Sequence, residues 1–133
     1  MGPVVADTHA ISWYILEPGI LSTKALVAFT EAENAGFPIY LPSISIVEIC
    51  YLIEKGRLTE TVLERILSAV DDPEAAVVIT PLDSAVALAV RDIPRDLVPD
   101  MPDRIIAATA LHLGLSLVTR DSKIQGCGIP TIW

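Results

Sequence analysis

The sequence predicts an α/β protein with a central parallel β-sheet of about five strands and helices on both faces. Short apolar runs alternate with longer helical patterns along the whole chain, which is typical of this class. The short runs are almost continuously apolar, as strands buried on both faces are. With 133 residues, 52% of them apolar, the chain has the length of one domain and enough material for a core. We therefore expect a single domain spanning residues 1–133.

Turn residues and capping residues set the expected element bounds. Ser22 is the expected N-cap of a helix that stops at Gly36. The expected N-caps of the next two helices are Ser43 and Thr59, and a further helix is expected to start at Asp83 or Ser84. The expected strands cover residues 3–6, 37–41, 76–80, 115–118 and 130–133, and the expected helices cover residues 9–16, 23–35, 44–56, 60–70, 84–90 and 102–113.

A helix followed by a buried strand occupies residues 99–121, with a carboxylate at each junction. Asp103 falls in the first helical turn, just after Pro102, and Asp121 comes shortly after the strand. In a strand–helix–strand layer, helix N-termini and strand C-termini share one edge, where open α/β sheets bind ligands. Asp103 and Asp121 are therefore expected at the same rim.

Two more acids are expected at this rim. Asp7 follows the first strand, and Glu48 interrupts the apolar side of the helix over residues 44–56, where an unpaired buried charge would cost several kcal/mol or more. Four clustered carboxylates would repel by about 4 kcal/mol per pair at about 4 Å and an effective dielectric near 20. A divalent cation removes this repulsion, and carboxylate oxygens suit Mg²⁺ or Mn²⁺. A metal-bound water can attack phosphorus, so the cluster indicates phosphodiester hydrolysis.

Each acid also has a purely structural interpretation. Asp103 could belong to a capping box with Asp100 at the N-cap, Asp7 could be a turn residue, and Asp121 could begin an ordinary turn. Independent caps and turns would have no reason to converge on one rim, which favours the functional interpretation. Thr119 is a weaker candidate, because strands favour threonine in any case.

Composition excludes several classes of function. The chain has 9 basic and 17 acidic residues, a net charge of −8, which argues against broad non-specific binding of nucleic acid and favours a basic protein partner. No apolar run approaches the roughly 18 residues of a membrane span, and no secretion signal begins the chain, so we expect a cytoplasmic protein that does not enter a membrane. Cys50 and Cys127 are isolated, which argues against a disulfide framework or a zinc site.

The runs VVADTHAISWYI, LPSISIVEICYLIEKGRL, DMPDRIIAATALHLGLSLVTRD and GIPTIW together resemble PIN-domain ribonucleases of the VapC type, the toxins of bacterial and archaeal toxin–antitoxin pairs. The resemblance implies a PIN-like three-layer fold, Mg²⁺- or Mn²⁺-dependent endoribonuclease activity on RNA, a homodimer and a cognate antitoxin. By position, the family's four acids fall on Asp7, Glu48, Asp103 and Asp121, and its hydroxyl falls on Thr119. The proline of the family's D-P-x-D-R pattern is displaced by one place here, which blurs the role of Asp100 and leaves Asp103 and Arg104 matched.

On this interpretation Asp7, Asp103 and Asp121 bind the metal, Glu48 binds it directly or through water, and Thr119 orients that water. One alternative is aspartyl-phosphate chemistry at Asp7, although the nearby second acid and the lysine that it requires are missing. Another is a PIN-like scaffold that binds a protein and has no nuclease activity.

Several residues around the acids have open roles. The basic residues that flank the acids could hold phosphates or simply be solvated; they are Arg104, Arg120 and Lys123. Trp13, Tyr14, Tyr51 and Leu52 could cover a surface for a second subunit or an antitoxin helix, or pack in the core. His9 and His112 lack metal-ligand spacing and are expected to be structural.

Overall fold

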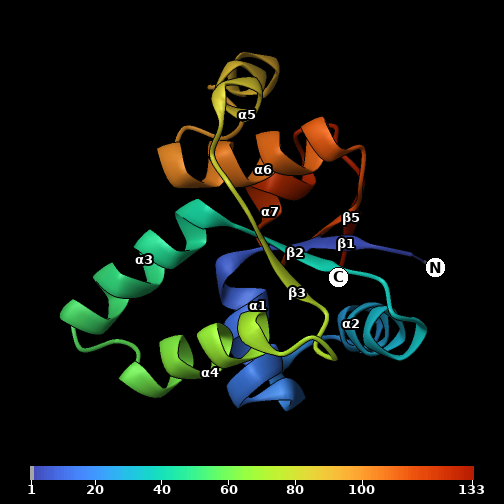
Figure 1. The fold of residues 1–133 in the computed structure, drawn as a ribbon. Helices are drawn as coiled ribbons and strands as arrows, with labels where there is room; N and C mark the ends of the chain where they lie inside the picture. The colour runs from blue at the N-terminus through green and yellow to red at the C-terminus, as the bar shows by residue number, and fades with distance from the viewer. Residues whose placement is uncertain (1) are drawn as a thin grey trace.

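A five-stranded parallel sheet forms the centre of the computed structural model, which describes residues 2–133 (Figure 1). The strand order is β3-β2-β1-β4-β5, and all four pairings are parallel. The strands are β1 (Val4–Ala6), β2 (Ile39–Pro42), β3 (Val77–Thr80), β4 (Leu117–Val118) and β5 (Thr131–Ile132). The predicted fold class is therefore confirmed. Each strand starts one or two residues later than the apolar run suggested, and β2 ends one residue later, at Pro42.

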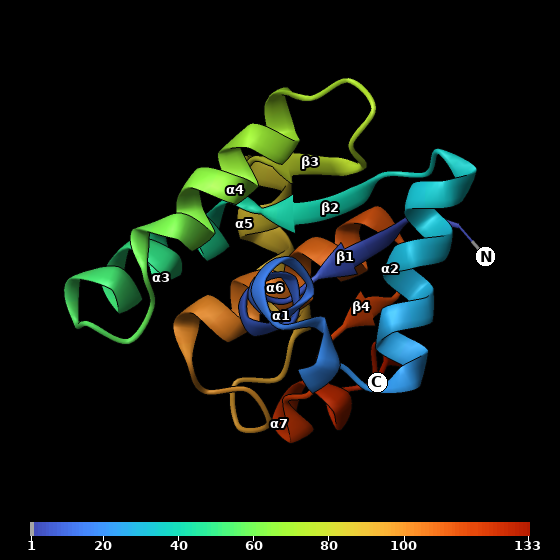
Figure 2. The same ribbon diagram turned by 90° about the horizontal axis from the view of Figure 1, so that it is seen from below.

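Helices cover both faces of the sheet (Figures 1 and 2). One face carries α1 (Thr8–Leu16), α2 (Thr23–Ala35) and α4 (Glu60–Asp71), and the other carries α5 (Ser84–Ala89), α6 (Met101–Leu113) and α7 (Ser122–Gln125). Helix α3 (Ser43–Glu54) leads away from the end of β2 and contacts both α4 and α6. The short 3-10 helices are η1 (Pro18–Ile20) and η2 (Val90–Asp92). No helix within residues 2–133 has both the length and the apolar character needed to cross a membrane.

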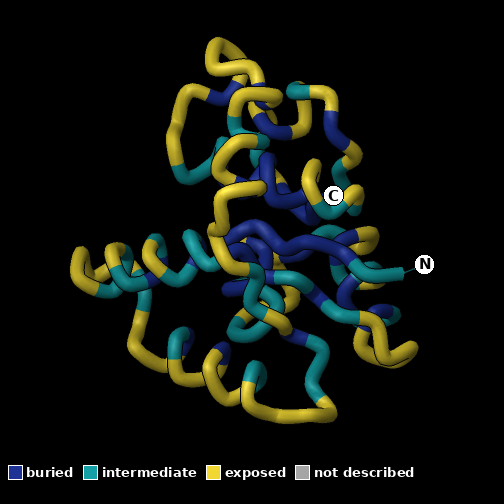
Figure 3. Tube along the Cα trace, turned by 45° about the horizontal axis from the view of Figure 1, so that its top comes forward, coloured by how far each residue is buried: buried dark blue, intermediate teal, exposed yellow. Residues whose placement is uncertain are grey.

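Alternation along β1 explains why the sheet is buried on both sides. Val4 and Ala6 pack into the core beneath α1, α2 and α4, whereas Val5 packs into a second core beneath α6 and α7. Leu117 and Val118 in β4 divide between the two cores in the same way. Figure 3 shows that the buried part of the chain is concentrated in the central strands and the segments against them. Both faces are apolar, so the strands read as continuous apolar runs.

The helix ends test the predicted caps. Ser22 accepts a hydrogen bond from the N–H of Ala25 at 3.1 Å, as expected of an N-cap. Ser43 is not an N-cap: α3 already begins at Ser43, and its hydroxyl accepts the N–H of Leu82 at 3.1 Å, which joins α3 to the loop after β3. Thr59 occupies the N-cap position of α4 but makes no capping bond with its side chain. The four-residue helix α7 was not predicted.

Gly114 ends α6 with a backbone angle φ of 67°, in the left-handed region that a Cβ disfavours. We expect Gly114→Ala to lower the free energy of unfolding by about 1 kcal/mol, because no atom of the protein blocks the new methyl group and only the backbone strain remains. Gly19→Ala, at a position without positive φ or steric contact, is the control and should change stability by less than about 0.5 kcal/mol. Urea unfolding of the two variants measures the difference, and equal stabilities would contradict the assignment.

Candidate active site

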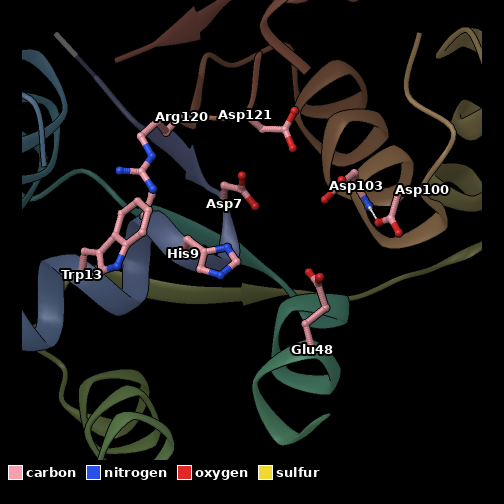
Figure 4. A pocket seen from close by; sticks show the side chains of 9 residues that line it. Asp7, His9, Trp13, Glu48, Asp100, Asp103, Arg120 and Asp121 are labelled. Atoms are coloured by element: carbon pink, nitrogen blue, oxygen red, sulfur yellow. Dashed lines mark hydrogen bonds between the residues drawn. The ribbon is translucent and has the colours of Figure 1, made fainter. Parts of the chain in front are cut away.

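The cleft lies where the chain reverses its path across the sheet. From β1 the chain adds β2 and β3 on one side and later returns to add β4 and β5 on the other, which makes the edge beyond β1 and β4 a topological switch point. A cleft of about 470 Å³ opens there (Figure 4). It is lined by Asp7, His9, Ala10, Trp13, Glu48, Asp100, Asp103, Arg120 and Asp121. All four predicted acids therefore meet in one place.

Asp7 is the most constrained of these acids. It follows β1, is 8% exposed, and both of its carboxyl oxygens accept hydrogen bonds: Oδ1 from the N–H of Thr8 at 2.7 Å and Oδ2 from the hydroxyl of Thr119 at 2.6 Å. Burial raises the pKa of Asp7, and the charge of Asp121 adds to the rise, although the two hydrogen bonds and His9 oppose it. The carboxyl group is thus held in a fixed orientation at the base of the cleft.

Thr119 lies beneath the cleft and does not line it. Its side chain is fully buried, its hydroxyl donates to Asp7, and its oxygen accepts the N–H of Asp121 at 3.1 Å. The hydroxyl has one proton, and Asp7 takes it. Thr119 therefore ties Asp7 to the segment that carries Asp121. Its predicted role in orienting water stays a prediction.

Glu48 points into the cleft from α3 and is half-buried. Its Oε1 accepts the hydroxyl of Thr8 at 2.7 Å, and the Ser45 hydroxyl lies 2.8 Å from the same Thr8 oxygen, so that Ser45 can donate to Thr8. Burial raises the pKa of Glu48, and Asp7 and Asp100 raise it further. The sequence predicted little polar company for Glu48, whereas the Thr8 hydroxyl contacts its carboxylate, Ser45 contacts that hydroxyl, and Tyr51 is exposed. The spacing of Ser45 and Glu48 on one helix face could have indicated this.

Asp103 stands in the first turn of α6, opposite Asp7 in the cleft (Figure 4). Burial raises the pKa of Asp103 to about 7, and the neighbouring charges raise it in the order Asp100, Asp7, Asp121 and Glu48. Asp100 is the N-cap of α6 and accepts the N–H of Asp103 at 3.2 Å. Asp100 therefore has the capping role that was considered for this pair, while Asp103 faces the other acids.

Asp121 both caps a helix and lines the cleft. It is the N-cap of α7, and its Oδ1 accepts the N–H groups of Lys123 at 2.8 Å and Ile124 at 3.1 Å. The same residue lines the cleft. The cap fixes the carboxyl group at the rim, so the structural and functional interpretations do not exclude each other.

The donor set suits a hydrated divalent cation better than a closed metal site. Within residues 2–133 no three His, Cys, Asp or Glu side chains stand close enough to hold a metal together. Five carboxylates nevertheless line one cleft, and the charges that shift the pKa values of Asp7, Glu48 and Asp103 are His9 and the other acids. Mg²⁺ commonly takes one or two carboxylates and fills its shell with water and phosphate oxygens. The residues present fit that mode.

The structure adds cleft residues that the sequence did not assign to the site. His9 is exposed and its ring centroid lies 5.5 Å from that of Trp13, and the guanidinium carbon of Arg120 lies 4.4 Å from the Trp13 ring centroid. His9 and Trp13 lie four residues apart and so share a face of α1. That spacing was the available signal for placing both at the cleft.

Comparisons with known proteins agree with the fold. The PIN domain family matches residues 4–127. Ribonuclease VapC22 from Mycobacterium tuberculosis is 31% identical over 137 aligned positions, which cover all of both chains. Among solved structures, VapBC2 from Rickettsia felis, bound to a DNA fragment from its promoter, superposes with a TM-score of 0.72 at 14% identity, covering 97% of this chain and 96% of that one. FitAB bound to the IR36 DNA fragment superposes with a TM-score of 0.62 at 24% identity, covering 96% and 92%. The chain therefore belongs to the PIN-domain family and is of the VapC type.

Proposed function

We propose that this protein is a Mg²⁺- or Mn²⁺-dependent endoribonuclease, the toxin component of a type II toxin–antitoxin pair. The observation that carries the proposal is the meeting of five carboxylates in one cleft at the switch point of the sheet. Such a site attracts a divalent cation, and cations bound by carboxylates bind phosphate oxygens in turn. The full-length similarity to Ribonuclease VapC22 supports RNA as the polymer.

Some cleft residues would bind the cation, and others orient the residues that bind it. A bound divalent cation supplies positive charge and lowers the pKa of a coordinated water. Asp7, Asp103 and Asp121 would hold that cation, one or two of them directly and the rest through water, and Glu48 would hold it directly or through water. Thr119 and the N–H of Thr8 fix both oxygens of Asp7, while the Thr8 hydroxyl orients Glu48. Asp103, with a pKa of about 7, can exchange a proton near neutral pH when no cation is bound.

Aspartyl-phosphate chemistry at Asp7 has less support. That chemistry requires a lysine near the phosphate and a second acid next to Asp7 in the sequence, and Thr8 and His9 follow Asp7 instead. No lysine lines the cleft among residues 2–133. The PIN-like scaffold without nuclease activity is separated from the nuclease by experiment.

The direct test is cleavage of total bacterial RNA by the purified protein. We expect cleavage with Mg²⁺ or Mn²⁺, none with a chelator, and products that end in 5′-phosphate and 3′-hydroxyl. A phosphoryl adduct on Asp7 would instead support the aspartyl-phosphate alternative. Intact RNA at every metal concentration, together with binding of a partner protein, would support the scaffold.

The resemblance also supports the partners that we propose. These are a cognate antitoxin, a second copy of the chain in a homodimer, and RNA encountered in the cytoplasm. The whole chain would act as one PIN domain, and the family match over residues 4–127 supports this. Co-expression of the chain with the small protein encoded beside it, followed by purification of the complex, tests the antitoxin.

Thr119→Val tests the support under Asp7. The substitution keeps the shape of the side chain but removes the hydroxyl that donates to Asp7 Oδ2. We expect cleavage to fall by about tenfold and the free energy of unfolding to fall by about 1 kcal/mol, because a buried carboxyl oxygen loses its partner. Thr119→Ser, which keeps the donor, should retain most of the activity. Full activity in the valine variant would show that the hydrogen bond is dispensable.

A further inference from the structure

We propose that Arg120, held against the face of Trp13, binds a phosphate of the RNA strand beside the phosphate that is cleaved. The inference rests on the proposed nuclease function and assigns a substrate-binding residue to it. Three basic residues flank the acids, namely Arg104, Arg120 and Lys123, and the sequence alone does not show which of them could bind phosphate.

The structure separates these three residues. Arg104 has an internal role, because its Nε and Nη2 donate to the carbonyl of Ile93 at 3.2 and 2.8 Å and its Nη2 donates to the carbonyl of Val90 at 2.8 Å. These bonds fasten η2 to α6. Lys123 is exposed on α7 and is not among the cleft residues. Only Arg120 is both exposed and part of the cleft lining among the three.

Trp13 holds the side chain of Arg120 in place through a cation–π contact. The guanidinium carbon lies 4.4 Å from the ring centroid, well within the roughly 6 Å of a cation–π contact. Trp13 is itself half-buried and braced by Trp133, whose ring lies edge-on with centroids 5.9 Å apart. The guanidinium is planar and carries five N–H donors, and such planar donors match phosphate oxygens in a bidentate manner.

The position of the pair in the cleft fits a strand that passes the acids. Figure 4 shows Arg120 and Trp13 at one end of the cleft and Asp100 and Asp103 at the other, with Asp7 between them. Without the contact with Trp13, the guanidinium would be attracted to the carboxylate of Asp7 and would neutralise the acidic cluster. The contact with Trp13 holds the guanidinium to one side, where it can meet a second phosphate while the acids remain available to a cation.

Charge makes this contact necessary. The chain has a net charge of −8, and five carboxylates line the cleft, so an RNA strand approaches an anionic surface. A divalent cation offsets this repulsion at the cleaved phosphate only. Arg120 supplies the positive charge for the neighbouring phosphate, because no other arginine and no lysine lines the cleft among residues 2–133.

The test measures binding separately from cleavage. A fluorescein-labelled pool of short single-stranded RNA of random sequence is titrated with the intact protein in Ca²⁺, and gels record whether the RNA stays whole. We expect Arg120→Gln to weaken binding by about tenfold to a hundredfold and to reduce the slope of log affinity against log salt by about 0.7, the contribution of one phosphate contact in a single strand. Arg120→Lys should keep the slope and lose affinity severalfold, because the charge remains and the planar donors do not.

Matched variants separate binding from structure. Lys24→Gln removes the same charge from α2, outside the cleft lining, and should leave both affinity and slope unchanged. Trp13→Phe keeps an aromatic ring for the contact with Arg120 and should bind RNA more tightly than Trp13→Leu. In cleavage assays, the Mg²⁺ concentration for half-maximal rate should be the same for Arg120→Gln and wild type, and an altered one would indicate a structural role and overturn the proposal.

Two further outcomes distinguish this inference from the function on which it rests. If wild-type protein binds and cleaves RNA, and Arg120→Gln keeps the affinity and the salt slope, the role of Arg120 is refuted and the nuclease stands. If the wild-type protein neither binds nor cleaves RNA, both fail together.

Discussion

Asp7→Asn is expected to reduce RNA cleavage by at least about 10³-fold, or roughly 4 kcal/mol of transition-state stabilisation. The substitution removes the most rigidly held negative charge of the cleft and leaves the volume of the side chain unchanged. The asparagine oxygen can still accept the N–H of Thr8, and the Thr119 hydroxyl can rotate to accept from the new amide. The loss therefore reports the charge and not the shape.

Stability should not follow activity in this variant. Burial raises the pKa of Asp7, so the ionised carboxylate destabilises the folded state relative to the unfolded chain at neutral pH. A neutral isostere removes that cost, and we expect the free energy of unfolding of Asp7→Asn to equal or exceed that of the wild type. Urea unfolding at neutral pH measures this directly.

Asp83→Asn is the matched control. Asp83 caps α5 by accepting the N–H of Val86 at 2.9 Å, lies outside the cleft lining, and is replaced by a residue that caps equally well. It should cleave RNA like the wild type. If Asp7→Asn retained more than about a tenth of the wild-type rate while folding normally, the acidic cluster would not be the active site.

The sheet could be predicted because its strands are buried on both faces. Val5 packs beneath α6 while Val4 packs beneath α2, so the whole run is apolar, and only the parallel α/β architecture buries such short runs in alternation with helices. Helix α7 escaped prediction because four residues are too few for periodicity, and its signal is the cap provided by Asp121. Ser43 was misassigned because its hydroxyl accepts from the distant Leu82.

The acids could be predicted because chain polarity alone brings strand ends and helix starts to one edge. The hydroxyl contacts between them could not, because they join Thr8 to Glu48 and Thr119 to Asp7 across 40 and 112 positions of the chain. The contact between Arg120 and Trp13 likewise joins distant parts of the chain, because it depends on how α1 packs near the end of β4. Sequence pattern indicates which edge a residue reaches, and packing decides which partner it meets there.

Without a divalent cation, the protein is expected to become less stable as the pH rises from about 4 to about 7. Asp103 has a pKa of about 7 when folded against 3.8 as a free side chain, so the folded state binds the proton more tightly across this window. Its stabilising contribution is full below the lower value and is lost as the pH rises through the higher one. The shift alone corresponds to about 4 kcal/mol, and we expect about 1–2 kcal/mol, because water screens this half-exposed carboxyl.

Mg²⁺ should reverse this loss, because it binds the ionised carboxylates. At about 100 times its dissociation constant a cation that binds only the folded state adds about 2.7 kcal/mol, so we expect a gain of that order near pH 7.5 and a much smaller one near pH 5, where Asp103 is protonated. Urea unfolding at both pH values, with NaCl of equal ionic strength as the control, measures the gain. Asp103→Asn should flatten the pH dependence, whereas Asp83→Asn should not. A metal-free protein that is most stable near pH 7.5 and indifferent to Mg²⁺ would mean that the carboxylates do not repel one another, and the argument for a cation in this cleft would fail.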